Sequence, residues 1–184
     1  MRREIREKTV LDEFCESFCK VVERHCPYII VSGFVAISSG RTRGTEDIDM
    51  IIAALQEREF LSLHDDLEKN NFFCMQSSKG REVYEYLKDK LSVRYTRKDK
   101  MLPEMELKFV KDKLDEYQLK TRMKLPLTGL DVWFGSINMN VAFKEELLKS
   151  GKDLADARHL RIVYSDLIDE REIIKIKEMI RKMR

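Results

Sequence analysis

The sequence contains little proline, glycine or cysteine. Three prolines and seven glycines among 184 residues exclude collagen-like repeats and long Gly- or Pro-rich linkers. The four cysteines form no Cys-x-x-Cys pair, and a zinc site would need further ligands at suitable spacing. We therefore expect reduced, partly buried thiols, as in a cytoplasmic protein.

Long apolar runs and a large excess of one charge are also missing. No run reaches transmembrane length, which predicts a chain without a membrane span. The charged N-terminal segment, residues 1–14, is typical of a helix and not of a signal peptide. Charged residues make up 37% of the chain, but the net charge is only +2, so no global basic field favours nucleic acid. The length favours one domain, or one domain with a small appendage.

Hydrophobic periodicity predicts alternating helices and strands in the first two thirds of the chain. Helices are predicted at 8–26, 33–39 and 56–70, and a short helix or a turn at 80–90. Strands are predicted at 28–32, 47–54, 72–77, 91–96 and 105–112. Residues 115–122 are compatible with another helix, and 123–136 with two short strands around Thr128-Gly129.

The remainder of the chain is predicted to be helical, with helices at 137–149, 152–165 and 169–183. This order indicates an α+β fold with a mixed sheet. We expect a core at 1–136, including the N-terminal helix, and a C-terminal helical subdomain at 137–184 packed on it.

Two aspartates interrupt an otherwise apolar strand in "DIDMII", residues 47–52. Asp is a poor strand former, and alternation places Asp47 and Asp49 on the same face. Two like charges at that spacing repel each other, and a cation is the simplest compensation. Because Mg²⁺ prefers oxygen ligands and keeps open positions for substrate phosphates, the pair predicts a magnesium site.

The preceding strand ends in Ser32-Gly33, where a helix is predicted to begin. Glycine lets a phosphate approach the backbone, and a helix N-terminus offers free N–H groups to it. This corner lies about 15 residues before the aspartates, so together they predict a metal–triphosphate site. The alternative is an ordinary turn followed by solvated aspartates at a strand start.

The segment "SGFVAISSGRTRGTEDIDMII" resembles the signature of the DNA polymerase β-like nucleotidyltransferase superfamily. Its Arg-x-Thr-x-Asp-apolar-Asp form, with Arg43 and Thr45 before the aspartates, resembles a small prokaryotic branch that includes minimal and AbiEii-type toxin nucleotidyltransferases. Residues 141–160, "VAFKEELLKSGKDLADARHL", resemble the C-terminal helical signature of that branch. One departure is Ser32-Gly33-Phe34, which stands where the family has Gly-Gly or Gly-Ser.

The resemblance implies a nucleotidyltransferase fold with a C-terminal helical extension and a third metal-binding carboxylate on a neighbouring strand. Glu106 and Asp131 are the two candidates. We favour Glu106, because it alternates with Lys108 on one face of a strand, whereas Asp131 follows a Gly turn. The catalytic and metal-binding set is then Asp47, Asp49 and Glu106, with Mg²⁺ or Mn²⁺ as the cofactor.

The resemblance also implies a nucleotide-binding set: Ser32, Gly33, Arg43, Thr45, Lys144 and Lys152. Arg41 would join it by neutralising phosphate charge, with a solvated loop as the alternative. For Lys152, Asp153 and Asp156 the alternative to a substrate role is helix capping and ion pairing between helices.

The implied activity is transfer of a nucleoside monophosphate from a triphosphate such as ATP to a hydroxyl, with release of pyrophosphate. The acceptor would be RNA, protein or a small molecule, and the toxin-like branch would add a cognate antitoxin as partner. The alternative is a catalytically silent nucleotide-binding or antitoxin-like interaction protein with the same fold. We expect a cytoplasmic location.

Overall fold

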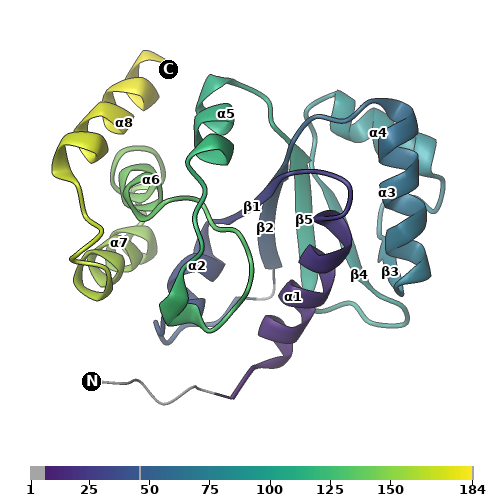
Figure 1. Ribbon diagram of the computed structural model, residues 1–184, viewed down its shortest axis with the longest axis horizontal. Coiled ribbons are helices and arrows are strands. Elements are labelled where there is room, and N and C mark those ends of the chain that lie inside the picture. The colour runs from purple at the N-terminus through teal and green to yellow at the C-terminus, as the bar shows by residue number, and fades with distance from the viewer. Residues whose placement is uncertain (1–6, 46, 184) are drawn as a thin grey trace.

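The computed structural model describes residues 7–45 and 47–183 (Figure 1). Of the charged N-terminal segment predicted at residues 1–14, residues 1–6 lie outside the described ranges. The strands are β1 (Tyr28–Val31), β2 (Asp47–Ile52), β3 (Phe72–Cys74), β4 (Val93–Arg97) and β5 (Glu104–Phe109). The helices are α1 (Val10–Val22), α2 (Gly33–Ser38), α3 (Glu57–Lys69), α4 (Gly80–Lys88), α5 (Lys113–Lys120), α6 (Ile137–Phe143), α7 (Gly151–Val163) and α8 (Glu170–Lys182).

The strands form one mixed sheet of five in the order β1-β2-β5-β4-β3. The central strands β2 and β5 run parallel, and every other pairing is antiparallel. Parallel strands need a long crossover, which α3, β3, α4 and β4 supply between β2 and β5. This confirms the predicted α+β fold with a mixed sheet.

The two faces of the sheet differ in character because side chains alternate along each strand. On one face, Met50 and Leu107 belong to a continuous buried core that includes α1 and α3. Aromatic contacts tie these layers together, as in Phe60 of α3 against Phe109 of β5, with ring centroids 5.9 Å apart. The opposite face carries the acidic residues of β2 and β5.

The helices lie on both sides of the sheet. In Figure 1, α3 and α4 lie to the right of the strands, and α6, α7 and α8 lie to the left. α2 contacts β1, β2 and α7, so it connects the sheet to the C-terminal helices. The boundary expected at residue 136 stays a prediction.

The prediction of two short strands at 123–136 is wrong. The segment forms only isolated bridges, which pair Met123 and Ile30 with Phe134, and a 3₁₀ turn, η1 (Pro126–Thr128), that ends at left-handed Gly129. Its apolar side chains, including Leu125 and Phe134, are still buried. The alternation in the sequence therefore reflected burial against the sheet edge and not a ladder of backbone hydrogen bonds.

The helix predicted at 137–149 changes character at its midpoint. α6 continues directly into a π-helical turn, η2 (Lys144–Leu148), which closes at Lys149 with a positive φ of 57°. Single π-helical turns within α-helices are frequently found at functional sites. Here the turn begins at Lys144, a buried lysine that faces α7.

The predictions about a membrane span and about the cysteines can be compared with the structure of the described residues. None of their helices combines the length and apolar character needed to cross a bilayer. Each of the four cysteines is free, with Cys15, Cys19 and Cys26 buried and Cys74 partly so.

Candidate active site

Three carboxylates come together on the polar face of the sheet. In the parallel pairing of β2 with β5, Asp49 lies opposite Glu106 and Asp47 opposite Glu104. Asp47, Asp49 and Glu106 each offer a carboxylate oxygen, and these oxygens lie within 4.8 Å of one another. Oxygen donors at that spacing are suited to Mg²⁺ or Mn²⁺.

The charges of this cluster act on Asp49. Burial raises the pKa of Asp49, and the neighbouring charges of Asp47 and Glu106 raise it further. A hydrogen bond to the Ser32 side chain and the charge of Lys108 oppose the rise. The protein thus holds a partly buried carboxylate among like charges, which a divalent cation would stabilise.

Two further side chains, Thr45 and Arg94, form hydrogen bonds to Asp47 and Glu106. Thr45 Oγ1 donates to the Asp47 backbone oxygen at 3.1 Å and to Asp47 Oδ1 at 2.8 Å. Arg94 of β4 lies across from Glu106 and donates from Nη2 to Glu106 Oε2 at 3.3 Å. Its Nε is 3.0 Å from Glu104 Oε1. Arg94 therefore bridges the two acids of β5.

The other candidate for the third carboxylate lies apart from this cluster. Asp131 is in the loop after η1, where its side chain is 91% exposed and pairs with Lys124 at 2.7 Å. That partner lowers the pKa of Asp131. Of the two candidates, only Glu106 lies beside the aspartates of β2.

The corner after β1 has an unusual backbone. Ser32 has φ 67° and ψ −138°, a conformation that costs a non-glycine residue on the order of 1–3 kcal/mol. Strain of this kind persists where the surrounding structure demands it. Here it turns the chain from β1 into α2 and brings the Ser32 side chain to Asp49. A glycine at this position would remove the strain.

Gly33 is required because Arg43 packs directly against it. A Cβ added to Gly33 would lie only 2.2 Å from Arg43 Nη2. The Nε atom of Arg43 is buried and has no hydrogen-bond partner among the described residues. A buried guanidinium with one unsatisfied donor is a candidate partner for an anionic oxygen.

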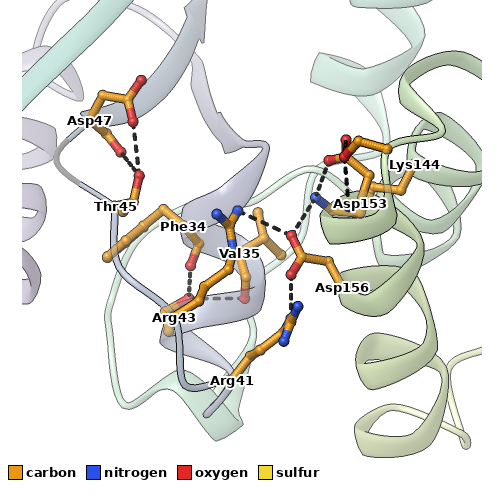
Figure 2. A network of polar contacts seen from close by, with 11 residues as sticks. Phe34, Val35, Arg41, Arg43, Thr45, Asp47, Lys144, Asp153 and Asp156 are labelled. Atoms are coloured by element: carbon orange, nitrogen blue, oxygen red, sulfur yellow. Dashed lines mark hydrogen bonds and ion pairs between the residues drawn. The ribbon is translucent and has the colours of Figure 1, made fainter.

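Asp156 joins the loop after α2 to the C-terminal helices, as Figure 2 shows. This fully buried carboxylate accepts from Arg41 Nε at 2.5 Å, Arg43 Nη2 at 3.1 Å and Lys144 Nζ at 3.0 Å. Asp153 adds a second acid 3.6 Å from Lys144 Nζ. Burial alone would raise the pKa of Asp156, but these cations together lower it.

This network answers several questions that the sequence left open. Asp156 makes ion pairs, as the non-substrate alternative predicted, and Arg41 is one of its partners rather than a solvated loop residue. Lys144 is only 1% exposed and already paired. Its direct contact with a nucleotide stays a prediction.

A groove of about 350 Å³ runs between the corner and α7. We call it the corner groove, and its lining is Ser32, Gly33, Arg43, Thr45, Asp47, Asp49, Leu148, Ser150, Lys152 and Asp153. The groove therefore contains most of the residues proposed from the sequence for nucleotide binding. Lys152 is exposed at its rim and has no ion pair within the described part of the chain.

Two residues near the acids, Arg94 and Lys108, were not assigned to the site in the sequence analysis. Arg94 lies in the strand predicted at 91–96, and only the pairing of that strand with β5 brings its side chain to Glu106. Lys108 was used solely as a face marker. It is two residues beyond Glu106, so it shares the polar face and could have been found by alternation once β5 was known.

Comparison with known proteins shows the fold. No family model matches the sequence, and no curated protein matches it. Among solved structures, the antibiotic-resistance factor ANT(2″)-Ia in complex with adenylyl-2″-tobramycin has a TM-score of 0.56 at 17% identity, covering 95% of this chain and 99% of that one. Its solution structure gives 0.54 at 13%, covering 94% and 92%.

A second protein gives the same result. A nucleotidyltransferase-like protein from Paracoccidioides brasiliensis has a TM-score of 0.52 at 19% identity, covering 94% of this chain and 88% of that one. At such low identities the likeness concerns architecture alone. The chain therefore has the nucleotidyltransferase fold, while membership of the AbiEii-type branch stays a prediction.

Proposed function

We propose that this protein is a metal-dependent nucleotidyltransferase that transfers a nucleoside monophosphate from a nucleoside triphosphate to a hydroxyl. The observation that carries the proposal is the meeting of Asp47, Asp49 and Glu106 beside the corner groove. Phosphoryl transfer requires carboxylates that hold a cation and positively charged side chains that hold phosphates, and Arg43 and Lys152 of the groove are such side chains.

The donor set fits divalent ions and a polyphosphate. The three acids supply oxygen atoms on one face, and burial among like charges raises the pKa of Asp49, which indicates a missing countercharge. The unsatisfied Nε of Arg43 fits an anionic oxygen in the groove. Divalent ions bound by the acids would polarise the phosphate oxygens and lower the pKa of the acceptor hydroxyl.

Each residue then has a task set by its position. Arg43 and Lys152 hold the β- and γ-phosphates, together with the Ser32 hydroxyl and the backbone at Gly33. Glu106 is assigned the acceptance of the proton from the attacking hydroxyl, because it is the acid on β5 beside the aspartates of β2. The acceptor oxygen forms a bond to the α-phosphorus, the bond from that phosphorus to the bridging oxygen breaks, and pyrophosphate leaves with the electron pair.

The rival is a silent relative that keeps the fold as a nucleotide-binding or antitoxin-like scaffold. The complete acid cluster and its supports Thr45 and Arg94 favour an enzyme, since a scaffold has no need of clustered, mutually repelling carboxylates. The acceptor stays open among RNA, protein and small molecules. A cognate antitoxin and a cytoplasmic location also stay predictions.

Thermal unfolding with and without Mg²⁺ or Mn²⁺ tests the proposal for ATP, CTP, GTP and UTP. At a hundredfold excess over Kd, binding adds about 2.7 kcal/mol, which raises the Tm by roughly 5–10 °C for a chain of this size. An enzyme shows this shift only with metal and then labels an acceptor from an α-labelled nucleotide. A Tm shift with nucleotide but no labelling of RNA, protein or small-molecule extracts would identify the silent nucleotide-binding relative. The absence of any Tm shift would identify a scaffold that does not bind nucleotide.

A further inference from the structure

A second cavity is lined by Asp49 of the acid cluster. Its volume is about 400 Å³, and it shares Ser32, Asp49 and Leu148 with the corner groove. We call it the side pocket. Apolar walls come from Leu114 of α5, Phe143 and Leu147 of the α6–η2 segment, and Ile180 of α8. Figure 1 shows these elements gathered at one end of the molecule, beside β1 and β2.

Three lysines line the side pocket: Lys108, Lys111 and Lys144. Lys144 pairs with Asp156 and Lys111 is exposed, so Lys108 is the half-buried lysine that makes no ion pair among the described residues. It lies on the polar face of β5, and its charge acts on both Asp49 and Asp115. Within the described residues its ammonium makes no hydrogen bond and has no acid within 4.0 Å. A half-buried ammonium without a direct partner is available to an oxygen or ring-nitrogen acceptor of a ligand.

The sheet order indicates which part of the reaction lies in this pocket. The corner is on β1, the acids are on β2 and β5, and the next strand is β4. In an in-line displacement the acceptor enters opposite the leaving pyrophosphate. If the pyrophosphate lies at the β1 corner, the acceptor comes over β4, on the side of Arg94. The side pocket lies over β1, β2 and the Lys108 end of β5, off that line.

We propose that the side pocket holds the nucleoside of the bound triphosphate, with the base between the apolar walls and Lys108 donating to a base or ribose acceptor atom. This inference rests on the proposed function and adds the site that recognises the nucleoside. A pocket of about 400 Å³ falls within the usual range for small-molecule sites, and its apolar walls, with polar groups such as Lys108, Gln118 and Asn140 among them, suit a base.

The experiment compares each nucleoside triphosphate with tripolyphosphate, which has the phosphates but no nucleoside, by calorimetry in the presence of Mg²⁺. The wild type should bind at least one nucleoside triphosphate about tenfold more tightly than tripolyphosphate, as base contacts typically add. Leu147→Trp fills the pocket and should abolish that difference, while tripolyphosphate binding stays within about twofold. Leu127→Trp, a matched change at an exposed leucine of η1, should keep the difference.

Lys108→Met tests the pocket without adding bulk. It should weaken nucleoside triphosphate binding about fivefold and leave tripolyphosphate within about twofold, whereas Lys113→Met, on exposed α5 surface, should change neither. The proposal is overturned if Leu147→Trp preserves the nucleoside advantage, or if Lys108→Met weakens both ligands equally. If neither ligand binds the wild type with Mg²⁺, the proposed function itself fails, so the two failures are distinguishable.

Discussion

Arg43 lies over Gly33 in the space that a side chain there would need, with Nη2 only 2.2 Å from the position of an added Cβ. The same guanidinium donates to Asp156 at 3.1 Å. One arginine thus links the phosphate corner to a buried carboxylate of α7. Any change at Gly33 must therefore act on the corner groove through Arg43.

Gly33→Ala should displace Arg43 and weaken Mg²⁺-dependent tripolyphosphate binding about tenfold or more, the effect of losing one charge-assisted hydrogen bond. Calorimetry measures the loss. Gly44→Ala is the matched control, since a Cβ there meets nothing within 4 Å. Equal affinities for the two variants would contradict the role given to Arg43.

Ser32 offers a test that separates backbone strain from its hydroxyl. Ser32→Gly and Ser32→Ala both remove the hydroxyl, but only glycine adopts φ 67° without strain. We expect the glycine variant to be more stable than the alanine variant by about 1 kcal/mol in urea unfolding. The order would be reversed if the turn relaxed to a negative φ in solution.

The acid cluster predicts three different outcomes. Asp47→Asn with Asp49→Asn should abolish the metal-dependent thermal shift with nucleotide, because the cation loses its main ligands. Glu106→Gln should lower the transfer rate by about 10² to 10⁴, the usual contribution of a general base.

Asp131→Asn should retain activity, since that side chain is exposed and pairs with Lys124. Inactivation by Asp131→Asn would reassign the third carboxylate.

Arg94 should position Glu106 rather than bind nucleotide. Arg94→Ala should lower the transfer rate about ten- to hundredfold through misplacement of Glu106, with nucleotide affinity unchanged. Because Arg94 is 47% exposed, its loss should change stability by less than about 1 kcal/mol. Arg81→Ala, which breaks an exposed pair with Glu57, should affect neither quantity. A fall in nucleotide affinity for Arg94→Ala would argue against a positioning role.

Asp156→Asn should destabilise the protein by about 3 kcal/mol at neutral pH, since it leaves Lys144 buried without its nearest acid. The pKa of Asp156 is lowered in the folded protein, so its stabilisation is complete above the ordinary value of 3.8 and declines as pH falls through the folded value. The stability gap between the wild type and the variant should therefore narrow below about pH 4. Urea titrations from pH 3 to 7 would measure it, and a gap that widened in acid would exclude the ion pairs as its cause.

Much of the fold could be predicted from the sequence, because strands and helices differ in the period of their apolar residues. Strand β2 and helix α3 follow from alternation and from 3.6-residue spacing, and the structure confirms both. The segment 123–136 misled, because apolar residues alternate there for burial without a partner strand. The π turn at Lys144 could not be predicted from the helical pattern, since it spans only five residues and so short a segment does not reveal a different period.

The acids of β2 and the glycine of the corner could be located from the amino-acid sequence, because both depend on a local pattern. Asp47 and Asp49 share a face by alternation alone, and Gly33 follows directly from the strand end. That Glu106 and not Asp131 lies beside them, that Arg94 contacts Glu106, and that Asp156 pairs with Arg41, Arg43 and Lys144 became known from the three-dimensional structure. These pairings depend on strand register and helix packing, and Arg41 lies 115 residues from Asp156, so no local period encodes them.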